Sequence, residues 1–141
     1  MPGIKEFQPY LMDILARFPV GMAYLYGSYS KGTQNLDSDI DIALVLKDNL
    51  SPLRILKIEM QVGALLDKEF QSEFDIRCIN NAPLRVKGEI VTRGRLIYCS
   101  DEDFRISFET HIRARYFDFL PAILSMRKVY FTSIKSGGLI G

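Results

Sequence analysis

Residues 38–46, SDIDIALVL, predict a β-strand whose two faces differ completely in polarity. Side chains two residues apart on a strand point to the same face. Asp39 and Asp41 therefore project together, whereas the apolar residues between and after them project to the opposite face: Ile40, Ile42, Leu44 and Leu46. The apolar face must be buried, so the register of the strand is fixed and the two aspartates are held side by side.

The patterns on either side of this segment predict further strands and several helices. We expect strands at residues 22–27, 73–79 and 95–99, and helices at residues 5–18, 52–69 and 83–93 and from residue 102 onward. Pro9 indicates that the first helix becomes regular near that residue, and Pro121 is expected to interrupt the last one. The predicted fold class is α+β (mixed α/β): a short mixed sheet of 3–4 strands with flanking helices and a C-terminal helical segment.

The aspartates suggest a metal site. Two neighbouring carboxylates repel each other, which raises at least one pKa unless a cation lies between them, and Mg²⁺ suits carboxylate oxygens. Asp75 and Arg77 share one face of the strand at residues 73–79. If this strand lies beside the first one, Asp75 completes a cluster of three carboxylates, and Arg77 either neutralises a phosphate or pairs with a carboxylate. Taken alone, the Asp-x-Asp pair also fits a solvated strand entry.

Gly27 and Ser28 follow the strand predicted at residues 22–27. A glycine at this place lets a ligand approach the backbone, and successive N–H groups at the start of a helical segment bind anions. Ser28 adds a hydroxyl donor. Lys31 adds a positive charge, although it fits equally well as a solvated loop lysine. An anion-binding turn next to a divalent-metal site suits a metal-bound nucleoside triphosphate.

Composition and length exclude several classes of protein. The formal net charge of +1 argues against direct binding of nucleic acid through counterion release. Cys78 and Cys99 make no disulfide framework, and no apolar run approaches the ~20 residues that a membrane span needs. We therefore expect a cytoplasmic protein without a membrane partner. Its 141 residues predict a single domain, 1–141, with a catalytic core at about 10–80 and a helical C-terminal part at about 81–135.

The spacing of these residues resembles a known signature. Ten residues separate Ser28 from Asp39, which gives Gly-Ser-x10-Asp-x-Asp, the pattern of the polymerase-β-type nucleotidyltransferase superfamily. The segment GSYSKGTQNLDSDIDIALV is similar to the minimal nucleotidyltransferase (MNT) branch of that superfamily, as are the later segments FDIRCIN and GRLIYCSDEDFRISFE. The resemblance extends from about Leu11 to about Tyr116.

The resemblance implies a small nucleotidyltransferase fold and a role for each matched residue. Gly27 and Ser28 would bind the triphosphate of ATP, and Lys31 stands where the family often has arginine. A lysine keeps the charge but loses the bidentate fork of a guanidinium. The resemblance also implies that Asp39, Asp41 and Asp75 are the catalytic carboxylates and the ligands of Mg²⁺, with two ions expected.

Members of the MNT branch are commonly encoded beside HEPN-domain ribonucleases as antitoxins. The resemblance therefore implies an enzyme that transfers AMP from Mg-ATP to a hydroxyl of a partner HEPN toxin, plausibly on a tyrosine, with any oligomer formed through the toxin complex. One alternative is an antitoxin that acts by binding and occlusion, with a vestigial nucleotide site. Another is a nucleotidyltransferase for small molecules, although such enzymes usually need additional chain to enclose the acceptor.

Overall fold

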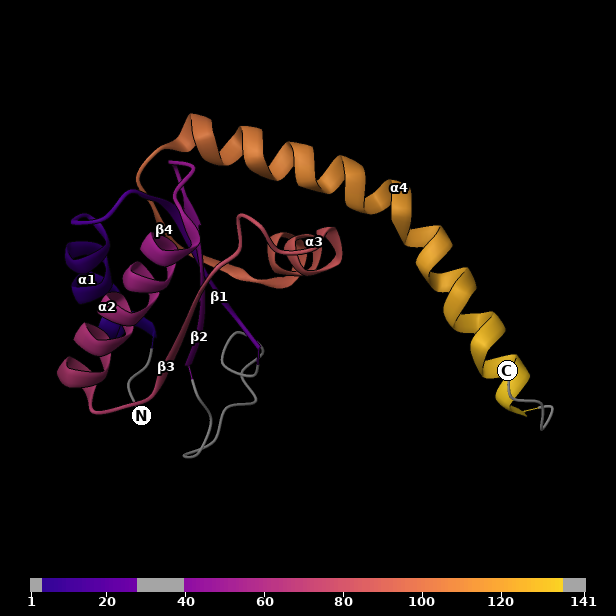
Figure 1. Cartoon of the computed structure of the whole chain (residues 1–141), viewed down its shortest axis with the longest axis horizontal. Coiled ribbons are helices and arrows are strands. Elements are labelled where there is room, and N and C mark those ends of the chain that lie inside the picture. Colours follow the sequence, from indigo (N-terminus) through magenta and orange to yellow (C-terminus); the bar gives the residue numbers. More distant parts are fainter. Residues whose placement is uncertain (1–3, 28–39, 136–141) are drawn as a thin grey trace.

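The structure is a computed structural model that describes residues 4–27 and 40–135. The described part contains a four-stranded sheet and four helices (Figure 1). In chain order the elements are α1 (Ile4–Leu15), β1 (Val20–Tyr26), β2 (Ile40–Leu46), α2 (Pro52–Phe70), β3 (Phe74–Cys78), α3 (Leu84–Arg93), β4 (Arg95–Cys99) and α4 (Glu102–Lys135). The predicted α+β class with a mixed sheet is confirmed.

The strands lie in the order β3-β2-β1-β4. β1 pairs antiparallel with β2 and with β4, and β2 pairs parallel with β3. A parallel pair requires a crossover connection, which α2 supplies between β2 and β3. β2 and β1 are therefore the two central strands, and β3 and β4 are the edges.

The helices cover the two faces of the sheet in pairs (Figure 1). α1 and α2 lie on one face, where their apolar stripes bury the face of β2 that carries Ile40 and Ile42. α3 and α4 pack on the other face, over a smaller cluster of buried residues: Met22, Tyr24, Ala43, Val45, Ile79 and Ile90. β2 is thus buried on both faces, and Asp41 is its one half-exposed residue.

Local interactions define the start of α2 and the state of the two cysteines. The Ser51 side chain accepts a hydrogen bond from the Arg54 amide at 3.4 Å and so caps α2, and Pro52 follows at the first helical position. Cys78 and Cys99 are free thiols on opposite edge strands, so they cannot pair within one chain. None of the helices in the described ranges combines the length and the apolar character that a membrane span requires.

Both proline expectations are wrong. α1 begins at Ile4, five residues before Pro9, and α4 continues through Pro121 to Lys135 as one helix of 34 residues. A proline within a helix removes one hydrogen bond and bends the axis, but the turns on either side can still continue. Figure 1 shows α4 changing direction along its length as it extends away from the sheet.

Candidate functional site

Three side chains form a row across neighbouring strands: Tyr26 on β1, Asp41 on β2 and Asp75 on β3. Asp41 pairs with Tyr26 in the antiparallel register and with Asp75 in the parallel one. Residues directly opposite one another on adjacent strands point to the same face of the sheet. The structure therefore brings Asp41 and Asp75 together, on the face covered by α3 and α4. We call these three residues the carboxylate row, after its two aspartates.

The carboxylate row carries an excess of negative charge. Asp75 forms an ion pair with Arg77 at 3.3 Å, and the two side chains are 38% and 68% exposed. The nearby charge of Asp75 is the main cause of the raised pKa of Arg77. Of the two roles expected for Arg77, the structure therefore shows the pairing with a carboxylate. Burial, followed by the negative charges of Asp41 and Asp75, raises the pKa of Tyr26 to about 12. Despite Arg77, the field of the two carboxylates is therefore felt at the tyrosine ring.

Gly27 ends β1 immediately beside the row. Its φ of +74° lies in the left-handed region, which favours glycine. A Cβ atom at this position would also stand 2.6 Å from Oδ2 of Asp41, closer than a real contact allows. The positive φ disfavours other residues here, and any Cβ would also require the Asp41 carboxylate to move. Because Gly27 has no side chain, the backbone can pass close to the Asp41 carboxylate.

Three of the six predicted site residues lie outside the described residues. Ser28, Lys31 and Asp39 belong to the segment 28–39, so their predicted roles stay predictions. Within residues 4–27 and 40–135, no three His, Cys, Asp or Glu side chains are grouped closely enough to hold a metal ion. Asp41 and Asp75 are two of the three predicted ligands, and the third, Asp39, is not among the residues searched.

A cleft of about 240 Å³ lies on the β1 side of the row, between the Gly27 turn and α3. Its lining includes Tyr26 and Gly27 from β1 and its turn, and Arg85, Glu89 and Arg93 from α3. Sequence reasoning assigned no functional role to these residues. Arg85, Glu89 and Arg93 follow one another at intervals of four residues, which aligns them on one face of the helix and was a visible signal. We call this space the α3 cleft.

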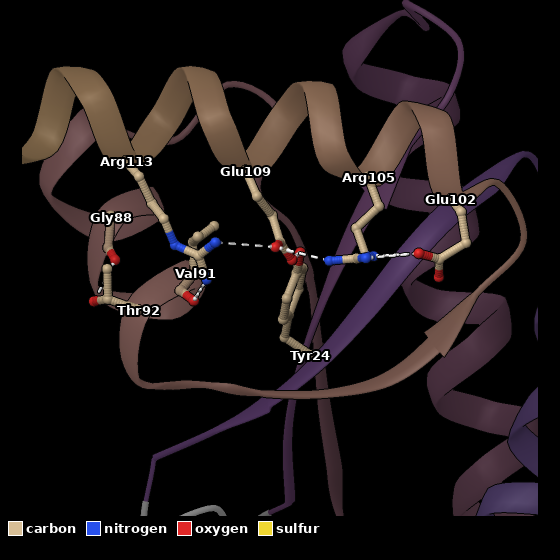
Figure 2. Close-up of polar contacts among 8 residues, drawn as sticks. All are labelled: Tyr24, Gly88, Val91, Thr92, Glu102, Arg105, Glu109 and Arg113. Atoms are coloured by element: carbon tan, nitrogen blue, oxygen red, sulfur yellow. Dashed lines mark hydrogen bonds and ion pairs between the residues drawn. The ribbon is translucent and has the colours of Figure 1, made fainter.

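A second polar cluster on the same face fixes α4 to the sheet (Figure 2). The Tyr24 hydroxyl donates a hydrogen bond of 2.5 Å to Glu109, which is 6% exposed. Glu109 also forms ion pairs with Arg105 at 2.9 Å and with Arg113 at 3.4 Å. Burial, followed by the hydrogen bond to Glu109, raises the pKa of Tyr24. Sequence reasoning missed this Glu109 cluster, although arginines four residues before and after a glutamate on one helix are a visible signal.

Comparison with known proteins gives the family. Residues 10–103, about two-thirds of the chain, match the family described as Polymerase beta, Nucleotidyltransferase. The chain is also similar to the protein adenylyltransferase MntA of Shewanella oneidensis, at 32% identity over 82 residues. That match covers 58% of this chain and 56% of MntA, so the chain spans about half the length of the curated relatives it matches.

Solved structures share the fold. One is the tri-AMPylated Shewanella oneidensis HEPN toxin in complex with MNT antitoxin; the match has a TM-score of 0.62 at 19% identity and covers 94% of this chain and 98% of that chain. Another is a toxin–antitoxin with AMP-PNP, with a TM-score of 0.65 at 21% identity, covering 91% and 98%. The matched segment contains Gly27, Asp41 and Asp75, and the chain belongs to the polymerase beta nucleotidyltransferase family.

Proposed function

We propose that the protein transfers AMP from Mg-ATP to a hydroxyl group, on a tyrosine, of a partner HEPN ribonuclease toxin and neutralises the toxin by this modification. The observation that carries the proposal is the in-register pairing of Asp41 with Asp75 beside the left-handed Gly27 turn, in a chain of the nucleotidyltransferase family. An antitoxin that acted by occlusion alone would have no physical need for this arrangement of carboxylates.

The residues of the site fit a divalent cation. Asp41 and Asp75 offer carboxylate oxygens, which hard cations prefer, and their negative charges are a contribution, second to burial, to the raised pKa of Tyr26. Asp39 would complete the ligand set from the position two residues before Asp41. Bound Mg²⁺ would supply stabilisation of the negative charge on the attacking and leaving oxygens of an in-line displacement.

The transfer itself is a balanced substitution at phosphorus. The acceptor oxygen forms a bond to the α-phosphorus, the bond from that phosphorus to the bridging oxygen breaks, and pyrophosphate leaves. Asp75 would orient the acceptor hydroxyl and take its proton, which would then pass to solvent. Its side chain is 38% exposed at the edge of the row, so an acceptor can reach it from outside.

ATP would approach from the β1 side of the row. The backbone of Gly27, the hydroxyl of Ser28 and the charge of Lys31 would bind the triphosphate. The α3 cleft adjoins this turn, and its lining includes two guanidinium groups, those of Arg85 and Arg93, and one carboxylate, that of Glu89. Guanidinium groups bind phosphate oxygens in a bidentate manner, so the cleft is suited to an anionic nucleotide.

The relatives support the choice of partner. MntA is named a protein adenylyltransferase, and one structure of similar fold contains a tri-AMPylated HEPN toxin with an MNT antitoxin. The net charge of +1 favours a protein acceptor over free nucleic acid. The proposal includes a cytoplasmic location, where ATP is available, and an oligomer formed through the toxin complex.

The test is transfer of AMP to a partner HEPN-domain protein. The purified pair is incubated with Mg²⁺ and each of the four nucleoside triphosphates, and the partner is followed by intact-mass spectrometry. We expect the mass of AMP to be added with ATP. Asp41→Asn should slow transfer by about 10³-fold, because a cation ligand of a metal-assisted displacement contributes several kcal/mol. Asp48→Asn, which changes an exposed aspartate after β2, is the matched control and should transfer AMP at the wild-type rate.

Protection of cells separates the alternatives. Asp39→Asn and Asp41→Asn should fail to protect cells that express the toxin, although circular dichroism shows them to be folded. Protection equal to that of the wild type would establish occlusion in place of catalysis. AMP transfer to a small hydroxyl compound, with none to the HEPN protein, would establish the small-molecule activity.

A further inference from the structure

A groove of about 500 Å³ follows the outer edge of β3, between this strand and α2. Asp75 and Arg77 lie along its β3 side, and α2 supplies Leu56, Met60 and Ala64 on the other. The α3 cleft is lined from β1, two strands away, so the two spaces flank the carboxylate row from opposite sides. We call the space along β3 the β3 groove.

The two spaces differ in charge. The β3 groove is lined by three carboxylates, Glu59, Asp67 and Asp75, and by one guanidinium, Arg77. The α3 cleft has the opposite balance, with two guanidinium groups to one carboxylate. Surfaces of one sign attract ligands of the other sign and repel those of the same sign. The β3 groove therefore disfavours a triphosphate and favours a cationic occupant.

The backbone at this edge of the sheet is already satisfied at two points. The amide of Phe74 donates a hydrogen bond to Asp67 at 2.9 Å, and the amide of Cys78 donates one to Glu59 at 2.7 Å. Side chains that cap an edge strand prevent it from pairing with another chain. An occupant of the β3 groove must therefore be recognised through its side chains, and it cannot add to the sheet as a fifth strand.

An apolar wall completes the groove. Leu56 and Met60 stand one turn apart on α2, and they are 50% and 64% exposed. Large apolar side chains that line a depression at an active-site edge favour burial against a partner. Together with the carboxylates, they suit a segment that carries both apolar and basic side chains.

We propose that the β3 groove is the docking site for the acceptor segment of the partner protein, and that this segment combines apolar side chains with lysine or arginine. The inference rests on the proposed function, in which Asp75 orients the acceptor hydroxyl. Asp75 lines the groove at the outer edge of β3, so a segment held there and passing round this edge brings its hydroxyl to the Asp75 carboxylate. ATP and the acceptor then reach the row from opposite sides, each attracted by the charge of its own entrance.

The first test compares two substitutions on α2. Met60→Arg places a positive charge in the groove, whereas Leu53→Arg places the same charge on the same helix outside the lining residues. The two wild-type side chains are matched in exposure, at 64% and 62%. With the HEPN-domain protein as acceptor, Met60→Arg should raise the KM for the acceptor about tenfold, and Leu53→Arg should leave it within about twofold. The KM for ATP, measured in the same assays, is the internal reference.

A second pair of variants separates charge from size. Ala64 is exposed and lines the groove. Ala64→Lys should weaken acceptor binding, and Ala64→Glu should strengthen it or leave it unchanged. The difference should shrink as salt is added, because exposed charges are screened.

Each outcome decides the matter. A KM effect confined to Met60→Arg and Ala64→Lys supports the groove. Active transfer with the same KM for the acceptor in Met60→Arg and Leu53→Arg overturns the docking inference and leaves the proposed function intact. Absence of AMP transfer by the wild-type protein overturns the proposed function, and the groove inference with it.

Discussion

Two polar clusters occupy the same face of the sheet, and the same strand contributes to both. Tyr24 and Tyr26 lie two residues apart on β1, one in the Glu109 cluster and the other in the carboxylate row. Glu109 is almost fully buried, accepts hydrogen bonds from the Tyr24 hydroxyl and the Arg105 guanidinium, and forms an ion pair with Arg113. Asp75 is partly exposed and has one exposed arginine beside it, and Asp41 lies next to it in register.

The two clusters differ in how their negative charges are compensated. In the Glu109 cluster the buried charge is fully compensated, and the contacts join α4 to the sheet (Figure 2). In the carboxylate row two negative charges are held together by the register of three strands, and their field reaches Tyr26. A cluster of the first kind stabilises the fold, whereas a cluster of the second kind is suited to a cationic ligand.

The largest effect on stability should come from Glu109. Glu109→Ala leaves the Tyr24 hydroxyl and the Arg105 guanidinium without their buried acceptor. Loss of one partner from such a cluster costs about 3 kcal/mol of the free energy of unfolding. Glu102→Ala is the matched control, because Glu102 also pairs with Arg105 but is 62% exposed, and it should cost no more than about 1 kcal/mol. Urea unfolding followed by circular dichroism measures both. Equal losses would show that the buried Glu109 contributes no more to the free energy of unfolding than an exposed ion-pair partner does.

The two tyrosines provide a smaller and sharper contrast. Tyr24→Phe removes a buried hydrogen bond to a charged acceptor and should lower the free energy of unfolding by about 2 kcal/mol. Tyr26→Phe leaves the Glu109 cluster intact and should change stability by less than about 0.5 kcal/mol. The same urea experiment applies. A loss for Tyr26→Phe as large as that for Tyr24→Phe would show that the carboxylate row stabilises the fold as much as the Glu109 cluster does.

The smallest effect is a dependence on alkaline pH. The pKa of Tyr26 is about 12 in the folded protein, against 10.0 for an ordinary tyrosine. A group with a raised folded pKa contributes stability that is complete below its unfolded pKa and is lost as pH rises through the folded value. The wild type should therefore lose stability between about pH 10 and 12, and Tyr26→Phe should lose less in urea unfolding series across that window.

Asp75→Asn should lower the pKa of Tyr26, because it removes one of the two negative charges near the ring. Absorbance at 295 nm can follow the titration, and an unchanged pKa would show that the charge of Asp75 does not act on Tyr26.

The sequence predicted the part of the site that depends on local periodicity. Alternation along residues 38–46 and 73–79 correctly assigned the faces of β2 and β3, and Asp75 could be placed beside Asp41 once the two strands were assumed to be neighbours. The Glu109 cluster depends on contacts across 85 residues, and no local pattern indicates which residue of α4 reaches β1. The roles of Asp39, Ser28 and Lys31 stay predictions.

The order of elements along the chain also has a consequence for folding during synthesis. The carboxylate row and its support on β1, β2, α2 and β3 come from residues 20–78, whereas β4 and α4 come later. β1 therefore remains an unprotected edge strand until β4 has been made, and Tyr24 lacks Glu109 until α4 has emerged. Contacts at such long separation form late, and open strand edges promote association between chains. We expect the ribosome-bound chain to form the carboxylate row before β1 is protected against association with other chains.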